Sequence, residues 1–119
     1  MSRVSNIEHG GSTILFLDFS NISTTEVPAM LTEARTVIHA AAPKSLKIMS
    51  DFTNARYDKG TTEDVKAFSA SNKPYVKASA VVGITGMKKI IFTGIIAATG
   101  RKMNLCNTRD EAKQWLASQ

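Results

Sequence analysis

Hydrophobic positions are most concentrated between Ala78 and Gly100, where two kinds of spacing follow one another. The stretch from Ala80 to Ile84 is continuously apolar, which is typical of a strand buried on both faces. After Thr85-Gly86 the apolar residues recur at helical intervals, which predicts a helix with one apolar face. The predicted face consists of Met87, Ile90, Ile91, Gly94, Ile95 and Ala98. A buried strand that leads directly into a helix indicates an α/β fold in which helices cover a mostly parallel sheet.

The first half of the chain predicts a strand pair followed by a helix. A short edge strand over residues 3–8 precedes a turn at Gly10-Gly11 and a second strand from Thr13 to Phe19, and we expect the two strands to pair antiparallel. The next helix has its apolar stripe at Val27, Met30, Leu31, Ala34, Ile38 and Ala41, and Pro43 ends it. Because proline is tolerated in a first helical turn, Pro28 favours Thr25 over Ser23 as the N-cap.

The second half continues the alternation of strands and helices. A strand from Ser45 to Asp51 precedes a polar loop over residues 52–60, and Thr61 and Asp64 have the spacing of a capping box for the next helix, which ends before Pro74. Gly100 ends the helix that begins near Met87. The last elements are a strand from Met103 to Cys106 and a helix capped by Thr108, which packs through Ala112, Trp115 and Leu116. The predicted order is β-β-α-β-α-β-α-β-α, in a single domain over residues 1–119.

Composition narrows the class of protein. The chain has 119 residues, of which 43% are hydrophobic and 21% charged, as in soluble globular domains. Its apolar runs fall short of the roughly 20 residues that a membrane span needs. The first 11 residues lack the apolar core of a signal peptide, and Cys106 is the single cysteine, so we expect a cytoplasmic protein without an internal disulfide.

The formal net charge of +5 bears on possible partners. The basic residues are scattered along the sequence, and their densest groups are the pairs Lys88-Lys89 and Arg101-Lys102. Nucleic-acid binding would need a concentrated basic face or a known motif. The pattern therefore favours a solvated basic surface without a specific nucleic-acid partner, with weak attraction to phosphate-bearing molecules as the alternative.

Three segments of the second half resemble a known family. They are KASAVVGITG at residues 77–86, GRKMNL at residues 100–105 and NTRDEAKQWL at residues 107–116. These segments are similar to the SpoIIAA-like branch of the STAS superfamily, which is named after anti-sigma-factor antagonists and has lipid-handling CRAL-TRIO proteins among its fold relatives. The resemblance covers roughly residues 12–118. It implies a single STAS-like domain, but it says almost nothing about function and implies no particular substrate.

The resemblance does not extend to the phosphorylation switch of STAS antagonists. Phosphorylatable members carry an Asp-Ser-Ser-Gly sequence at the start of a helix, whereas this chain has Asp58-Lys59-Gly60-Thr61-Thr62. Lys59 stands where the serine pair is expected. We interpret Thr61 and Thr62 as helix-capping residues, with modification of either one as the alternative.

Candidate binding residues follow from the predicted sheet. Open α/β sheets bind ligands at the carboxyl ends of their parallel strands, where we expect residues 51–62, 83–87 and 106–108 to converge. The turn from Gly83 to Gly86 either presents N–H groups to an anion beside Lys88 or only permits a tight connection, and it matches neither phosphate-binding nor dinucleotide-binding motifs. The candidate binding residues are Thr53, Asn54, Arg56, Asp58, Lys59, Thr61, Thr85, Gly86 and Lys88.

Catalytic and metal-binding patterns are weak. His9 and His39 are isolated, and Cys106 has no base partner, so we interpret His39 as structural and Cys106 as a buried apolar residue. Asp18 and Asp51 end neighbouring strands, where carboxylates commonly accept hydrogen bonds from loop N–H groups. We therefore expect no enzyme activity, no metal and no cofactor. The methionines at positions 30, 49, 87 and 103 most simply fill gaps in the core, although a soft pocket for an acyl chain is the alternative.

Two functional hypotheses follow. The first is a regulatory module that binds another protein through the loop at residues 51–62 and the helix after it, with Arg56, Asp58 and Lys59 as contacts. The second is a carrier or sensor for a small anionic or lipid-like ligand in the crevice at the strand ends. The edge strand at residues 3–8 also leaves homodimerisation open.

Overall fold

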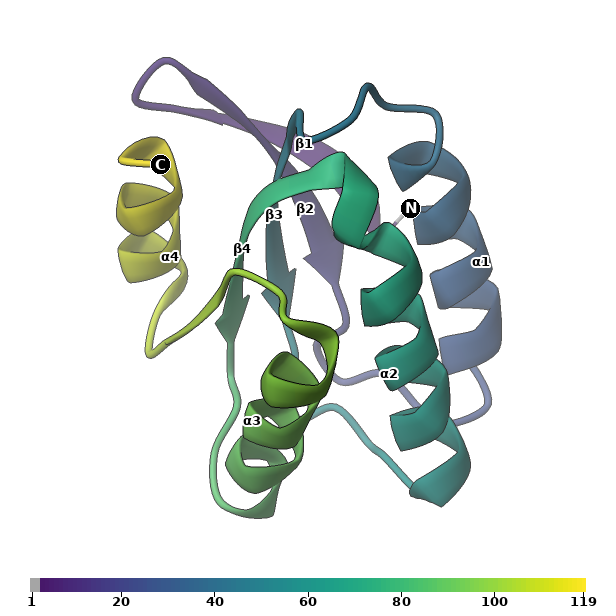
Figure 1. Ribbon diagram of the computed structural model, residues 1–119. Helices are drawn as coiled ribbons and strands as arrows, with labels where there is room; N and C mark the ends of the chain where they lie inside the picture. The colour runs from purple at the N-terminus through teal and green to yellow at the C-terminus, as the bar shows by residue number, and fades with distance from the viewer. Residues whose placement is uncertain (1–2) are drawn as a thin grey trace.

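The computed structural model describes residues 3–119, in which five strands form one sheet in their sequence order, β1-β2-β3-β4-β5 (Figure 1). The first pair is antiparallel and the other three pairs are parallel. The elements are β1 (Val4–His9), β2 (Ser12–Asp18), α1 (Val27–Ile38), β3 (Leu46–Asp51), α2 (Lys59–Asn72), a 3-10 turn (Lys73–Tyr75), β4 (Val76–Val82), α3 (Met87–Thr99), β5 (Met103–Cys106) and α4 (Arg109–Ala117). This architecture confirms the predicted fold class and element order.

The hairpin of β1 and β2 forms as the two glycines predict. Gly10 and Gly11 both have positive φ angles, 56° and 79°, which a two-residue turn of this twist requires. The register runs from Val4 opposite Leu17 to His9 opposite Ser12. The antiparallel pairing expected for the first two strands is therefore confirmed.

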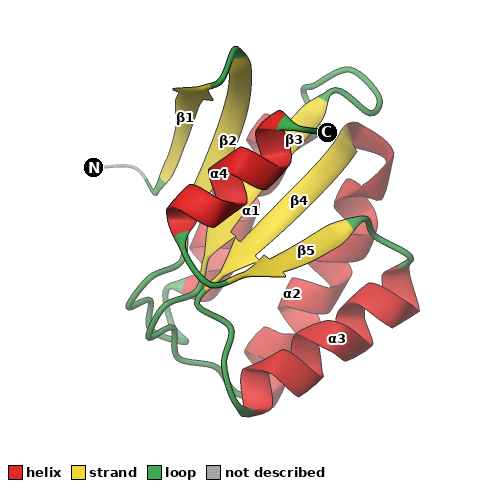
Figure 2. Cartoon of the chain, turned by 90° about the vertical axis from the view of Figure 1, so that its left-hand side faces the viewer, coloured by secondary structure: helices red, strands yellow, loops and turns green. Residues whose placement is uncertain are grey.

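The helices are divided unequally between the two faces of the sheet. Each parallel connection moves to the next strand in the same direction, so right-handed crossovers place α1, α2 and α3 on one face. The shorter α4 crosses the opposite face alone (Figure 2). Along β4, Val81 packs toward the first face and Val82 toward α4, and they are only 2% and 4% exposed. The predicted strand buried on both faces is confirmed.

Two helix starts differ from the predictions. The N-cap of α1 is Glu26 rather than Thr25, and its side chain accepts a 2.7 Å hydrogen bond from the Ser23 hydroxyl instead of capping the helix. Pro28 lies in the first turn as expected. The helix ends at Ile38, short of Ala41, because a turn already forms before Pro43.

The start of α2 lies one turn earlier than predicted. The capping box is formed by Asp58 and Thr61 rather than by Thr61 and Asp64. The Thr61 N–H donates to the Asp58 carboxylate at 2.8 Å, and the Asp58 N–H donates to the Thr61 hydroxyl at 2.8 Å. The earlier start makes Lys59 helical and buries Thr61, so the loop after β3 is shorter than the sequence suggested.

The buried face of α3 also differs from the prediction. Met87 and Ile90 of the predicted face are 67% and 69% exposed, and Ile95 is buried as predicted, but Phe92, which lay outside the predicted face, is buried too. Apolar residues occur all around this helix, so their spacing is compatible with more than one buried face. The helix lies at the edge of the molecule, where only a narrow strip of its surface is buried (Figure 1). Met87 therefore does not fill the core, while Met30 and Met49 do.

Two other predicted helix boundaries are confirmed. Gly100 ends α3 in the left-handed conformation with a φ of 66°, and its N–H donates to the Ile96 carbonyl. Thr108 caps α4 by accepting a hydrogen bond from the Glu111 N–H at 3.1 Å. Within residues 3–119, no helix has both the length and the apolar character needed to cross a membrane.

Candidate functional site

Two aspartates at the carboxyl ends of β2 and β3 hold the loops that follow them. Asp18 and Asp51 lie opposite each other in the parallel register. Asp51 accepts hydrogen bonds from the Thr53 N–H at 2.8 Å and the Thr53 hydroxyl at 2.6 Å, and Asp18 does the same for Ser20. Both carboxylates therefore accept hydrogen bonds from loop groups, as expected for strand-end aspartates.

Arg109, the first residue of α4, connects the two carboxylates. Its Nε donates to Asp51 Oδ2 at 2.7 Å, and its Nη2 lies 3.9 Å from Asp18 Oδ1. Burial alone would raise the pKa of Asp51, but the hydrogen bonds from Thr53 and Arg109 outweigh it and hold the pKa below its usual range. Asp51 is therefore a charged anchor between the sheet and α4, and it is a poor general base.

The loop after β3 passes very close to the end of β4. A Cβ atom on Gly83 would lie 2.4 Å from the Thr53 nitrogen, and Gly83 has a φ of +83°. Only glycine permits both the backbone conformation and this approach. The close contact fixes where the loop leaves the sheet and hence where Asn54, Arg56 and Tyr57 lie.

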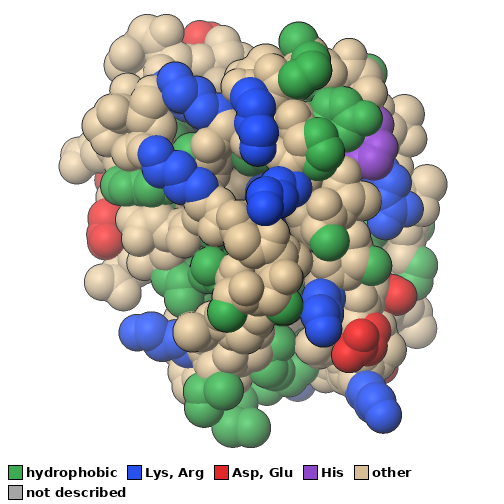
Figure 3. Space-filling model, in the orientation of Figure 1, with side chains coloured by type: hydrophobic (Ala, Val, Ile, Leu, Met, Phe, Trp, Pro, Cys, Tyr) green, Lys and Arg blue, Asp and Glu red, His purple; other side chains and the backbone are tan. Residues whose placement is uncertain are grey.

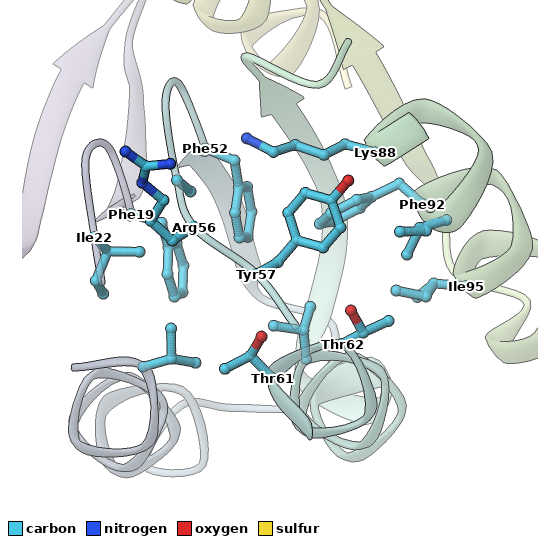
Figure 4. Close-up of a pocket in the computed structure, with 14 residues that line it drawn as sticks. Phe19, Ile22, Phe52, Arg56, Tyr57, Thr61, Thr62, Lys88, Phe92 and Ile95 are labelled. Carbon is cyan, nitrogen blue, oxygen red and sulfur yellow. The ribbon is translucent and has the colours of Figure 1, made fainter. Parts of the chain in front are cut away.

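A polar cup lies between this loop and the first turn of α3, and three residues of its wall, Arg56, Tyr57 and Lys88, are labelled in Figure 4. It is lined by Asn21, Asn54, Ala55, Arg56, Tyr57 and Lys88. The Lys88 ammonium lies 5.6 Å from the centre of the Tyr57 ring and extends toward the Arg56 side of the cup. The cup therefore combines two cations, two amides and a phenol at the strand ends.

The two cations of the cup lack a countercharge from the protein. Among the described residues, the side chains of Arg56 and Lys88 form no hydrogen bond or ion pair with another residue. Burial lowers the pKa of Lys88, and the positive charge of Arg56 lowers it further. An anion placed between them would relieve this repulsion.

An apolar pocket lies directly below the cup and shares part of its wall. The enclosed space measures about 40 Å³, so the pocket is a narrow slot between side chains. Its interior is aromatic and aliphatic, since Phe52 stacks on Phe19 at 4.5 Å and meets Phe92 edge-on at 4.9 Å. Its wall includes Phe19, Ile22, Val27, Phe52, Val65, Ile91, Phe92 and Ile95, and Arg56, Tyr57 and Lys88 are shared with the cup.

The structure brings together some of the residues singled out in the sequence and separates others. Asn54, Arg56 and Lys88 meet at the cup, and Thr61 lines the apolar pocket. Thr53 donates a hydrogen bond to Asp51, and Asp58 is the N-cap of α2. Lys59, Thr85 and Gly86 are exposed and line neither hollow, and residues 106–108 lie outside both.

Sequence reasoning missed two polar residues of the cup, Asn21 and Tyr57, and the apolar Ala55. Asn21 follows the end of β2, so the rule that placed the site at strand ends would have found it had it been applied to that strand. Tyr57 belongs to no sequence motif, and only its contact with Lys88 in the structure identifies it.

The hydroxyl groups of Thr61 and Thr62 take part in the start of α2. The Thr61 hydroxyl accepts a hydrogen bond from the Asp58 N–H, and the Thr62 hydroxyl donates to the Asp58 carbonyl at 2.8 Å. Both bonds match the interpretation of these residues as groups that begin a helix.

The isolated histidine and cysteine have structural surroundings. His39 Nε2 lies 3.1 Å from Asn72 Oδ1, and the ring stacks on Tyr75. Burial, together with the charge of Glu111, raises the pKa of the Cys106 thiol, which disfavours the reactive thiolate. Neither residue has the environment of a catalytic group.

Comparisons with solved structures find this fold at low sequence identity. An uncharacterized protein of the DUF3478 family with a SpoIIAA-like fold, from Shewanella loihica PV-4, superposes with a TM-score of 0.74 at 10% identity, over 95% of this chain and 91% of that chain. An anti-sigma-factor antagonist (STAS) domain protein from Planctomyces limnophilus superposes with a TM-score of 0.65 at 12% identity, over 96% of this chain and 97% of that chain. No family model and no curated protein matches the sequence significantly. The chain therefore has a SpoIIAA-like fold, which it shares with these two proteins.

Proposed function

We propose that this chain is a non-enzymatic regulatory module that binds an amphipathic anion at the cup and the apolar pocket below it. The observation that carries the proposal is the pair of cations, Arg56 and Lys88, that stand without a countercharge at the mouth of an apolar pocket. The similarity to a protein described as an anti-sigma-factor antagonist supports a regulatory role. We further propose that the module acts in the cytoplasm.

The two parts of the site select for different parts of such a ligand. A carboxylate or phosphate in the cup would replace the repulsion between Arg56 and Lys88 with two attractions. An acyl or aromatic body would push the side chains that line the narrow pocket apart and pack against the rings of Phe52 and Phe92. A ligand with only one of these properties would use only half of the site.

Binding of decanoate tests this proposal. We expect decanoate to raise the melting temperature of the wild-type protein more than decanol does, because only decanoate carries the charge that the cup lacks. A ligand present at 100 times its Kd stabilises a protein by about 2.7 kcal/mol. The double variant Arg56→Gln, Lys88→Met should lose the preference for decanoate, and native mass spectrometry should show the same loss.

Lys89→Met is the matched control, because Lys89 is exposed on the same turn of α3 and lines neither hollow. This variant should bind decanoate as the wild type does. Equal binding of decanoate and decanol, or unchanged binding by the double variant, would contradict the proposal.

A protein partner is the second candidate, and a patch of exposed apolar side chains near the loop favours it. Tyr57, Met87 and Ile90 are 45%, 67% and 69% exposed. On the face shown in Figure 3, hydrophobic side chains project at the lower end, over α3, and Lys and Arg side chains are spread over the rest of the face. A partner that covers this patch would also meet Arg56, Asp58 and Lys59.

Charge reversal on α2 tests this second candidate. A partner that co-purifies with the wild type should be lost on Lys59→Glu, because Lys59 begins α2 two residues after Tyr57 of the patch. It should be retained on Lys66→Glu, which makes the same change farther along the same helix. If both variants retain the partner equally, the loop at residues 51–62 is not part of the interface with that partner.

A further inference from the structure

Four exposed lysines lie at the end of the sheet opposite to the cup. The parallel strands β3, β4 and β5 all begin at this end, so the residues that lead into them come together there. The Lys44 N–H donates to the Pro74 carbonyl at 2.9 Å, and the Ser79 N–H donates to the Lys102 carbonyl at 3.0 Å, which joins the three strand starts. We call this group the lysine edge, and it consists of Lys44, Lys73, Lys77 and Lys102.

The fold brings these lysines close together although they are scattered along the sequence. The Lys44 ammonium donates to the Lys73 carbonyl at 3.0 Å. The Lys73 ammonium lies 3.0 Å from the place where a Cβ atom on Gly100 would be, two residues before Lys102. In Figure 3, the Lys and Arg side chains lie closest together in the upper part of the face, near the place where the chain enters β4 in Figure 1. The lysine edge is therefore a concentrated basic surface, which the sequence alone did not indicate.

The lysine edge lacks carboxylates to balance its charge. Within residues 3–119, none of its four lysines forms an ion pair with an Asp or Glu side chain, and Lys77 donates to a main-chain oxygen of Gln119 instead. The sequence has no Asp or Glu at positions 34–50 or 65–109, the two stretches that supply the edge. An external polyanion would therefore meet no opposing negative charge from these segments.

A buried cation behind the edge adds to its positive potential. Arg101 is only 8% exposed, its Nη1 donates to the Ser69 carbonyl on α2 at 2.6 Å, and its Nη2 donates to the Ser79 hydroxyl on β4 at 2.7 Å. Burial lowers the pKa of Arg101 to about 10, which still leaves the group charged at neutral pH. Because both of its partners are neutral, its charge contributes to the field at the surface.

We propose that the lysine edge binds the phosphate backbone of a nucleic-acid duplex, independently of base sequence. Lysine ammonium groups are point charges that contact phosphates and carry no information about bases. Proteins that bind single strands also present aromatic rings on which bases stack. Tyr75, the aromatic residue beside the edge, is half-buried and already stacks on His39 with the ring centres 4.6 Å apart. The edge thus offers charge without stacking, which suits a duplex.

The distribution of apolar side chains favours a duplex over a membrane surface. Met87 and Ile90, the most exposed large apolar side chains among residues 3–119, belong to the start of α3, beyond the opposite end of β4. A membrane that takes up apolar side chains would therefore contact that end of the molecule. The lysine edge also contributes no residue to the cup or to the apolar pocket, so this proposal and the proposed function can fail separately.

Fluorescence anisotropy with a labelled DNA duplex of about 20 base pairs tests the proposal through its salt dependence. Four phosphate contacts predict a slope of about −3.6 for the logarithm of the association constant against the logarithm of the salt concentration. Doubling the salt concentration should then weaken binding about twelvefold. Duplexes of different base sequence should bind with the same affinity.

Two triple variants of equal charge separate the lysine edge from net charge. The first is Lys73→Gln, Lys77→Gln, Lys102→Gln, and the control is Lys59→Gln, Lys66→Gln, Lys89→Gln. All six lysines are exposed, and each variant lowers the formal net charge of +5 by three. The first should weaken duplex binding by about tenfold or more and reduce the salt slope to about −1, whereas the control should keep most of both. Equal losses in the two variants would overturn the proposal.

Vesicles of phosphatidylcholine and phosphatidylserine test the membrane as the other polyanionic surface. We expect the wild type to bind the duplex more tightly than these vesicles at equal phosphate concentration. Binding to the vesicles alone, or no saturable binding to the duplex, would overturn the proposal. The preference for decanoate over decanol should be the same in the wild type and in the lysine-edge variant, because that variant leaves the cup intact.

Discussion

Gly83→Ala is expected to destabilise the protein by about 4 kcal/mol, which is at the upper end for a single substitution. Gly83 has a φ of +83°, a conformation that costs a residue with a Cβ atom roughly 1–2 kcal/mol. The new methyl group would also lie 2.4 Å from the backbone nitrogen of Thr53 and 2.7 Å from its Cα atom. Since both atoms belong to the backbone, the loop after β3 must move as a whole. Urea denaturation measures the loss.

Gly94→Ala is the matched control for this prediction. Gly94 lies within α3, and a Cβ atom there would meet nothing within 4 Å. Because alanine favours the helix over glycine, the control should be neutral or gain up to about 1 kcal/mol. Similar losses in the two variants would show that the close approach of Thr53 to Gly83 is not what requires glycine.

Asp51→Ala is expected to cost about 3 kcal/mol at neutral pH. Asp51 is 3% exposed and accepts hydrogen bonds from Thr53 and Arg109, so its removal leaves their donors without a buried acceptor. Asp18→Ala provides the comparison, because Asp18 occupies the equivalent register position but lies 3.9 Å from Arg109 and is partly exposed. The Asp18 variant should lose clearly less stability in the same denaturation assay. Equal losses would mean that Arg109 does not depend on Asp51.

The same interaction predicts a dependence of stability on pH. The folded protein holds the pKa of Asp51 below its unfolded value of about 4. A carboxylate with a lowered pKa stabilises the folded state fully above the unfolded pKa, and this stability is lost as the pH falls through the folded pKa. The difference in unfolding free energy between wild type and Asp51→Ala should therefore be largest near pH 7 and shrink below about pH 4. A difference that stays constant down to pH 2 would contradict this interpretation.

The backbone of this fold was largely predictable, because its strands and helices carry strong local signals. Glycines at positions 10, 11 and 100 adopt the positive φ angles that their places in turns predict. Where predictions failed, two local signals of similar strength competed. Asp58 with Thr61 and Thr61 with Asp64 both resemble capping boxes, and only the packed structure, which buries Thr61, distinguishes them. The apolar residues of α3 likewise fit two faces, and tertiary contact selects Phe92 over Ile90.

The candidate sites were predictable only in part. Arg56 and Lys88 follow strand ends, so the general rule for α/β sheets led to them. Arg101 stands beside Lys102 in the sequence, and such a pair is typical of a solvated surface. It is buried because it bonds Ser69 on α2 and Ser79 on β4, which precede it by 32 and 22 residues. No local pattern carries that information.

The order of the strands also bears on how the protein is made. Because every strand pairs with its neighbour in the sequence, a chain emerging from the ribosome can add each strand to a sheet that has already begun. The face formed by Ile14, Phe16 and Met49 is then covered only when α4, the final element, has been synthesised. Until that moment the nascent chain exposes a hydrophobic sheet surface, and it is at this stage of synthesis that we expect the protein to depend most on chaperones.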